Sequence, residues 1–149
     1  MEIQYKLADK NSLEISRIYQ TLYVPANYYP HFNDWFNKVV YDESRKIFLA
    51  TDADRIVGVS IIKDSLAESK LSTFFIANDY QNNGIGSKLM KYTLQNFVIN
   101  KVPLVTMPES ILYNFKHLIE KFKFYHIGTT HGQYQANKGE YYFRIEYNI

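Results

Sequence analysis

The order of the apolar segments predicts an α/β protein built on one mixed sheet, with the elements in the order β-α-α-β-β-β-α-β-α-β-β. Three observations lead to this prediction. Three strand patterns follow one another in the middle of the chain, the last of them passes through a glycine-containing loop into a helix, and a further strand–helix unit comes after it. Consecutive strands followed by a β-α-β unit favour a mixed sheet with helices on both faces. A length of 149 residues predicts one domain over residues 1–149.

The N-terminal elements follow from local patterns. Residues 1–7 alternate between apolar and polar side chains, which is typical of a half-buried strand. Ser12 can cap a helix that ends before Pro25. Residues 24–32 are rich in aromatic residues and predict a loop, and residues 35–40 form the apolar side of a short second helix.

The strands of the middle and the C-terminal part are apolar runs bounded by turn residues. Residues 47–50 and 56–62 predict a hairpin with its turn at residues 52–55. A helical crossover should make the strands 71–76 and 104–107 parallel neighbours. The last strands are predicted at residues 124–127 and 141–145, with a tip at residues 137–139. An amphipathic helix between them should carry the apolar residues Ile111, Leu112, Phe115, Leu118, Ile119 and Phe122.

The loop after the central strand reads Asp-Tyr-Gln-Asn-Asn-Gly-Ile-Gly-Ser-Lys over residues 79–88. Glycine and asparagine tolerate positive φ and allow a close approach of the backbone to a ligand. The first amides of the following helix have no intrahelical acceptor and can bind an anion, and Lys88 adds positive charge. The pattern lacks the features of a Walker loop or a dinucleotide fingerprint. An ordinary connection with tightly packed glycines is the alternative. Apolar residues at helical spacing follow at Ile85, Leu89, Met90, Tyr92, Leu94, Phe97 and Val98.

Composition excludes several classes of protein. Seventeen basic and fifteen acidic residues give a net charge of +2, which does not favour nucleic acid or an anionic membrane as a partner. The absence of cysteine excludes disulfides and thiolate chemistry, and the four histidines lack the spacing of metal ligands. No apolar run reaches the length of a membrane span. We therefore expect a soluble cytoplasmic protein without a metal.

The order of elements, with Tyr-Gln-Asn-Asn-Gly-Ile-Gly at residues 80–86, resembles the GCN5-related N-acetyltransferase (GNAT) family. The resemblance covers nearly the whole chain. Its strongest part is the strand and the loop Gln/Arg-x-x-Gly-x-Gly/Ala at residues 74–88. A weaker part is residues 111–128, where the family usually has a Gly-Phe pair and this chain has Lys123 and Phe124.

The resemblance implies an acetyl-CoA-dependent N-acetyltransferase. The acyl donor would lie where the fourth and fifth strands separate, and a neutral amine would attack the thioester without help from a metal. The backbone of Phe74, Phe75 and Ile76 would pair with the pantetheine arm. The pyrophosphate would be held by the loop residues Gln81, Asn82, Asn83, Gly84, Ile85, Gly86, Ser87 and Lys88.

The resemblance leaves the catalytic residues open. Where the family often has a tyrosine, this chain has Ile119, which cannot donate a proton. Tyr113 and His117, expected on the same helix, are the alternative candidates for the acid. Glu68 and Lys70 before the central strand, and Glu109 after the fifth strand, are the candidates for a base. For each of these residues a purely structural role is the alternative.

The resemblance implies that the acceptor would bind at the aromatic loop of Tyr28, Tyr29 and His31, with Tyr134 and Tyr141 as further candidates. A packed aromatic loop without a role in binding is the alternative. The class of the acceptor is a small-molecule or peptide amine, and a homodimer stays an option. Two other functions are considered. One is an acyl-CoA-binding module of the same fold without turnover, which Ile119 and Lys123 favour. The other is a toxin-like enzyme that acetylates aminoacyl-tRNA, for which scattered lysines give little support.

Overall fold

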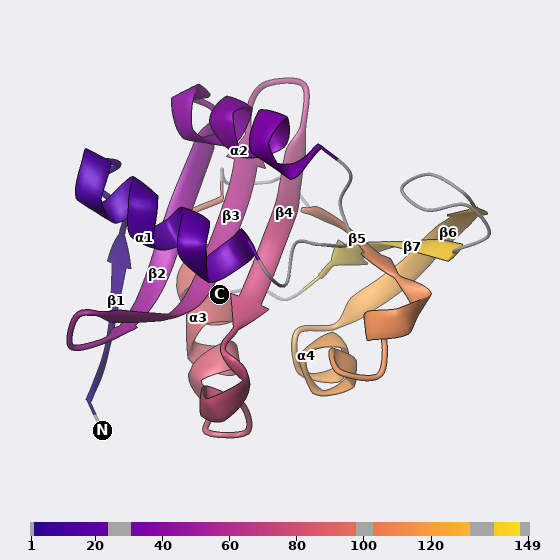
Figure 1. Ribbon diagram of the computed structural model, residues 1–149. Helices are drawn as coiled ribbons and strands as arrows, with labels where there is room; N and C mark the ends of the chain where they lie inside the picture. Colours follow the sequence, from indigo (N-terminus) through magenta and orange to yellow (C-terminus); the bar gives the residue numbers. More distant parts are fainter. Residues whose placement is uncertain (1, 24–30, 98–102, 132–138, 147–149) are drawn as a thin grey trace.

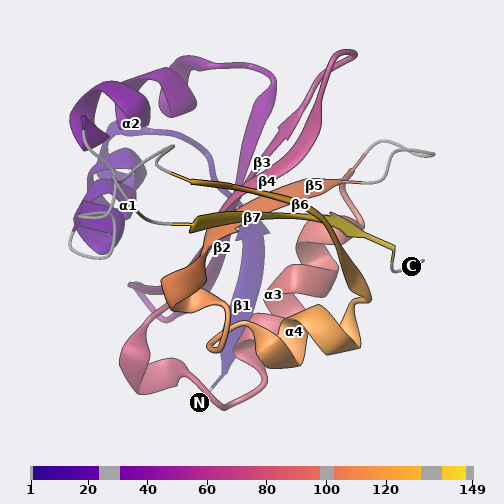
Figure 2. The same ribbon diagram turned by 90° about the vertical axis from the view of Figure 1, so that its right-hand side faces the viewer.

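The computed structural model describes residues 2–23, 31–97, 103–131 and 139–146. It has three layers, with α1 and α2 on one face of a central sheet and α3 and α4 on the other (Figures 1 and 2). The elements are β1 (Ile3–Leu7), α1 (Ser12–Tyr23), α2 (Phe32–Tyr41), β2 (Arg45–Asp52), β3 (Arg55–Asp64), β4 (Ser69–Ile76), the 3-10 turn η2 (Asn78–Tyr80), α3 (Ile85–Leu94), β5 (Leu104–Pro108), the 3-10 turn η3 (Glu109–Ile111), α4 (Lys116–Lys121), β6 (Phe124–His131) and β7 (Gly139–Ile145).

The seven strands form one sheet in the order β1-β2-β3-β4-β5-β7-β6. Every neighbouring pair is antiparallel except β4 and β5, which are parallel, as the crossover through α3 predicts. The predicted mixed sheet with helices on both faces is therefore confirmed. The element order also agrees with the prediction, and the strands are mostly longer than the apolar runs that indicated them.

Two clusters of buried side chains form the core, one on each face of the sheet. The cluster on the α1/α2 face contains Ile18, Phe36, Val39, Ile47, Leu49, Val59 and Ile61. The cluster on the α3/α4 face contains Phe48, Leu71, Leu89, Met90, Val105, Met107, Phe122, Phe143 and Ile145. Because successive residues of a strand point to opposite faces, membership of a cluster identifies the face of each side chain.

The central strand β4 contains a β-bulge. Ile61 and Ile62 of β3 are paired with Thr73 and Leu71, so Ser72 is an extra residue in β4. The extra residue reverses the face to which each later side chain of the strand points. Leu71 and Phe74 therefore both pack on the α3/α4 face although they are three residues apart. Phe75 consequently points to the α1/α2 face.

The predicted helix after the glycine loop is shorter than its apolar pattern. It ends at Leu94, and Phe97 lies in the turn that follows, while Val98 lies outside the described residues. The side chain of Asn96 donates to the carbonyl of Tyr92 at 2.7 Å, so it replaces the amide that would continue the helix.

Two further details differ from the sequence-based expectations. The cap of α1 is Asn11 and not Ser12, because Asn11 Oδ1 accepts from the amide of Glu14 at 2.9 Å. The helix expected from residue 111 begins only at Lys116. The residues before it form tight turns, in which the amide of Phe115 donates to the carbonyls of Leu112 (3.1 Å) and Ile111 (3.3 Å). Tyr113 therefore lies in this turn, whereas His117 is on α4.

Among the described residues, no helix has the length and apolar character needed to cross a membrane.

Candidate active site

The strands β4 and β5 separate shortly after they meet. Only two register pairs join them, Lys70 with Leu104 and Leu71 with Val105. Beyond Leu71, the edge of β4 that faces β5 has no strand partner within the described part of the chain. Free backbone groups on a strand edge can bind an extended ligand as if it were an added strand. We call the point where the two strands separate the fork.

The loop between β4 and α3 has the backbone conformation that its sequence predicts. Gly84 has a φ of 80° and Asn82 has a φ of 66°, both in the left-handed region that glycine and asparagine tolerate. The first helical hydrogen bond of α3 runs from the amide of Lys88 to the carbonyl of Gly84 at 3.2 Å. The preceding amides, from Ile85 to Ser87, have no acceptor among the described residues, and no side chain caps the helix.

The space in front of these amides fits an anion. A Cβ atom added to Gly86 would meet only Ile76 Cγ1, at 3.7 Å, and one added to Gly84 would meet no atom within 4 Å. The helix N-terminus carries partial positive charge, and the exposed Lys88 lies in its first turn. The residues present therefore suit the pyrophosphate of an acyl-CoA.

The side chain of Gln81 forms hydrogen bonds within the loop. Its Nε2 atom donates to the carbonyl of Ile76 at 3.0 Å and to Oδ1 of Asn78 at 3.2 Å. The glutamine of the motif thus connects the end of β4 to the loop, which fixes where the helix amides lie relative to the strand edge.

The same loop is anchored to the β2–β3 turn, an interaction that the sequence pattern did not reveal. Arg55 binds Asp79 with two hydrogen bonds, of 2.7 and 3.0 Å, and its guanidinium lies 5.0 Å from the centre of the Tyr80 ring. The hydroxyl of Tyr80 donates to the carboxylate of Asp52. The hydrogen bond from Arg55 lowers the pKa of Asp79, and the hydrogen bond to Asp52 raises the pKa of Tyr80.

A groove of about 430 Å³ lies between the loop and the start of α4. It is lined by Gln81, Asn82, Tyr113, Asn114, Lys116, His117 and Glu120. The structure thus brings two of the predicted catalytic residues, Tyr113 and His117, next to the exposed end of the glycine loop. Their catalytic role stays a prediction.

The other residues proposed from the sequence occupy varied positions. Glu68 forms an ion pair with Lys63 at 3.2 Å, and Glu109 is exposed at the end of β5. Ile119 packs against the core of the α3/α4 face. Lys123, which stands where the family has the glycine of the Gly-Phe pair, has a φ of 55°, in the left-handed region that glycine adopts readily.

The residues predicted for the acceptor lie largely outside the described part of the chain, including Tyr28, Tyr29 and Tyr134. His31 is described, and it is exposed at the start of α2 with a φ of 62°. Tyr141 packs against the core of the α3/α4 face, and its contact with an acceptor stays a prediction.

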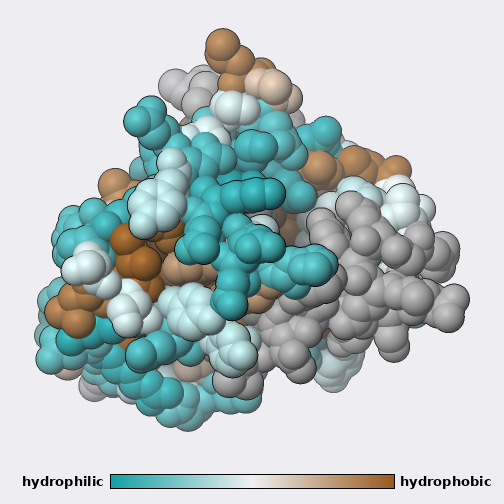
Figure 3. All heavy atoms as spheres, turned by 45° about the horizontal axis from the view of Figure 1, so that its top comes forward, coloured by the Kyte–Doolittle hydropathy of each residue, from teal (hydrophilic) through white to brown (hydrophobic). Residues whose placement is uncertain are grey.

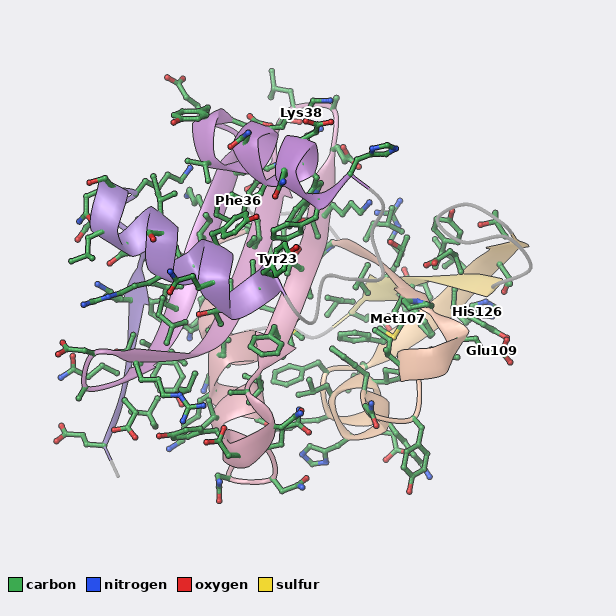
Figure 4. The ribbon with its side chains drawn as sticks, in the orientation of Figure 1. Tyr23, Phe36, Lys38, Met107, Glu109 and His126 are labelled. Atoms are coloured by element: carbon green, nitrogen blue, oxygen red, sulfur yellow. The ribbon has the colours of Figure 1, made fainter. Side chains whose placement is uncertain are left out.

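Polar residues on the α1/α2 face of the C-terminal strands were missed by the sequence reading. Thr106 is paired with Tyr142, and Pro108 is paired with Glu140. Because Met107 and Phe143 point to the α3/α4 face, these four residues point to the other. Glu140 is 1% exposed and is the single buried carboxylate among the described residues. Figure 4 shows Met107 and His126 on these strands, across from Tyr23 and Phe36 of the two N-terminal helices.

The bulge of β4 places a further polar group at the fork. Thr73 Oγ1 is buried and has no hydrogen-bond partner within the described residues. Ser72 donates to the carbonyl of Ile61 at 3.1 Å and accepts from Arg45 Nη1 at 3.2 Å.

The surface over α1 and α2 is mainly hydrophilic, with small hydrophobic patches (Figure 3). No group of side chains suited to a metal ion was found among the described residues.

Comparison with known proteins adds to this geometry. A family model described as an acetyltransferase (GNAT) domain matches residues 23–110, which is more than half of the chain. A search of curated protein sequences found no significant match.

Several solved structures have the same fold at low sequence identity. Arabidopsis thaliana NAA60 in complex with a bisubstrate analogue superposes with a TM-score of 0.82 at 15% identity, over 99% of this chain and 100% of that one. The ribosomal-protein-S18-alanine N-acetyltransferase from Escherichia coli gives 0.81 at 14% identity, over 99% and 96%. An aminoglycoside 6'-N-acetyltransferase complexed with coenzyme A gives 0.71 at 14% identity, over 97% and 96%.

Proposed function

Because the chain belongs to the GNAT acetyltransferase family, we propose that it transfers the acetyl group of acetyl-CoA to a primary amine. This proposal rests on two features that lie together at one end of β4. One is the free strand edge, and the other is the uncapped N-terminus of α3. The first can hold an extended arm and the second can hold phosphate, so together they suit a CoA thioester.

In this proposal the chain's own groups position the reactants. The amides of Ile85, Gly86 and Ser87 bind the pyrophosphate, and the free edge of β4 directs the thioester toward the fork. The backbone at the bulge and the buried hydroxyl of Thr73 are the polar groups that can stabilise charge on the acyl oxygen. Acetyl-CoA supplies the activated acyl group.

The acceptor is proposed to approach from the α1/α2 face. The opposite face of the sheet is covered by α3 and α4 (Figure 2). The half-buried Thr106 of β5 and Tyr142 of β7 lie on the α1/α2 face, and the described helices α1 and α2 lie over the other part of the sheet (Figure 1). Two structures of the same fold are named for an alanine of a ribosomal protein and for an aminoglycoside, so peptide and small-molecule amines are both proposed as acceptor classes.

The first test is binding of the acyl donor. Acetyl-CoA at about one hundred times its dissociation constant should stabilise the protein by about 2.7 kcal/mol, which is measurable as a rise in Tm. Calorimetry gives the affinity directly. If millimolar acetyl-CoA changes neither the Tm nor the heat signal, the assignment of the donor is wrong.

The second test is turnover, because a binding module of the same fold would also pass the first. Purified protein is incubated with acetyl-CoA and a panel of amines, and the release of free thiol is measured. The panel contains a peptide with an N-terminal alanine, a lysine-containing peptide, spermidine and kanamycin. Tight binding of acetyl-CoA without thiol release above the rate in buffer would favour the binding module, which the apolar Ile119 also suits.

A further inference from the structure

A row of three cationic side chains crosses the α1/α2 face of the sheet beside the fork. Arg45 of β2 is paired with Lys63 of β3, and Lys63 is paired with Lys70 of β4. Directly paired residues of neighbouring strands point to the same face. Ile62 and Leu71 belong to the core of the α3/α4 face, so their neighbours Lys63 and Lys70 point to the α1/α2 face.

Among the described residues, two of the three cations form an ion pair with a carboxylate, and Lys70 does not. Arg45 lies 3.4 Å from a carboxylate oxygen of Asp42, and Lys63 lies 3.2 Å from one of Glu68. Lys70 forms no ion pair or hydrogen bond within the described part of the chain. It is also partly buried, although lysine is a residue that proteins rarely remove from water without a partner.

The surroundings of Lys70 favour its neutral amine. Burial lowers the pKa of Lys70, and the nearby charges of Arg45 and Lys63 lower it further, while Glu68 and Glu140 act in the opposite direction. A lysine that is desolvated and next to other cations is a common form of activated amine in enzymes.

Lys70 also lies where the reaction is proposed to occur. It forms the first of the two pairs that join β4 to β5, with Leu104, and it precedes the bulge at Ser72 by two residues. Its side chain is on the face from which the acceptor is proposed to approach. The carboxylate of Glu68, the alternative base on this strand end, is already bound to Lys63.

We propose that Lys70 accepts the proton that the attacking amine releases. This inference rests on the proposed function. The nitrogen of the amine forms a bond to the acyl carbon, the carbon–sulfur bond breaks, and its electron pair leaves on the thiolate. The proton of the amine passes to Nζ of Lys70 and from there to the thiolate or to solvent, so atoms and charges balance.

The experiment compares Lys70→Arg and Lys70→Met with the matched control Lys63→Met, which removes a cation from the same row. Arginine keeps the positive charge but cannot serve as a base, whereas methionine removes the charge and keeps much of the length. We measure the affinity for acetyl-CoA by calorimetry and the rate of thiol release with the four amines named above. The intact mass of the parent protein is followed after incubation with acetyl-CoA.

We expect both Lys70 variants to lose between about 10² and 10⁴ in kcat, the usual contribution of a general base, with little change in the affinity for acetyl-CoA. Lys63→Met should lower kcat far less than either Lys70 variant, because it leaves the Lys70 amine in place and removes only one of the charges that favour its neutral form. A Lys70→Arg variant with parental turnover would overturn the inference, because charge alone would then suffice. Rapid acetylation of Lys70 itself would also overturn it, since the amine would then be a nucleophile.

A measurement that does not depend on turnover completes the test. The lysines are reductively methylated with ¹³C-formaldehyde, the Lys70 signal is assigned with the Lys70→Arg variant, and the signals are titrated by NMR. We expect Lys70 to titrate below the exposed lysines and its signal to shift when acetyl-CoA is added. Titration together with the exposed lysines would overturn the inference even if no amine reacted. Parental turnover in both variants would refute the inference alone, whereas a parent that fails to bind acetyl-CoA would refute the proposed function.

Discussion

The two edges of β4 differ in how much of their length is paired with a neighbouring strand. Toward β3, β4 is paired along its whole length, from Ser69 with Asp64 to Ile76 with Gly58. Toward β5, it is paired only at Lys70 and Leu71. One strand thus contributes its first edge to the stability of the sheet and keeps most of its second edge available for a ligand. Changes at the first edge should alter unfolding, and changes at the second should alter binding.

The largest expected effect is at the N-terminus of α3, next to the open edge of β4. Gly86→Glu places a carboxylate at the helix N-terminus, where a pyrophosphate is proposed to bind and where like charges repel. We expect the affinity for acetyl-CoA to fall by about 100-fold, equivalent to about 2.7 kcal/mol, as measured by calorimetry. The neutral variant Gly86→Gln separates bulk from charge. Unchanged affinity in a folded Gly86→Glu protein would show that the loop is only a connection.

The next effect concerns the fully paired edge. A Cβ atom added to Gly58 would lie 3.0 Å from Ile76 Cδ1 and 3.1 Å from both Ala50 Cβ and Leu89 Cδ2. Gly58→Ala should therefore lower the free energy of unfolding by about 1–3 kcal/mol through overpacking, as measured by urea denaturation. Gly128→Ala is the control, because its added Cβ would meet no atom within 4 Å. Equal stability of the two variants would contradict the tight packing of α3 against β3.

A smaller effect is expected in the groove beside the glycine loop. Tyr113 and His117 line this groove together with Gln81 and Asn82. Tyr113→Phe and His117→Ala should weaken acetyl-CoA by a few-fold and leave kcat nearly unchanged, if these residues contact the nucleotide. Steady-state kinetics separates the two effects, because weaker binding raises KM for acetyl-CoA whereas a lost catalytic group lowers kcat. A hundredfold loss of kcat at constant affinity in either variant would instead make that residue the proton donor.

The smallest effect concerns stability and pH at the fork. Burial lowers the pKa of Lys70, so the folded protein binds this proton less tightly than the unfolded chain does. The cost of the buried ammonium is present at neutral pH and declines as the pH rises toward the ordinary value for lysine. Lys70→Met should therefore raise the Tm at neutral pH, and its advantage over the parent should shrink in alkaline solution. A variant that is less stable than the parent at neutral pH would contradict this.

The backbone geometry of the proposed donor site could be predicted because its residues are contiguous in the chain. The strand, the loop and the helix start follow one another, so their roles depend on local backbone chemistry, such as the positive φ of Gly84 and Asn82. The parallel pairing of β4 and β5 also followed from the chain order, because a helical crossover between them has one preferred geometry.

The proposed acceptor side could not be predicted in the same way, because its residues come from strands that are distant in the chain. Which face a side chain occupies depends on the register, and the bulge at Ser72 reverses the alternation that the sequence suggests. The sequence offered Tyr141 as an acceptor residue, and the register places Tyr142 and Glu140, but not Tyr141, on the face from which we propose that the acceptor approaches. The anchor between Arg55 and Asp79 joins residues 24 positions apart and has no local signal.

The open edge of β4 has a definite length. From Leu71 at the fork to Ile76 beside the glycine loop, five residue steps of about 3.3 Å give about 16 Å. Gln81 holds the loop to the end of the strand, so this span is fixed on both sides. In the proposed binding mode, an acyl carrier has to span this distance to reach from the helix amides to the fork. We therefore expect acetyl-N-acetylcysteamine, which has a shorter arm and no phosphate, to bind far more weakly than acetyl-CoA.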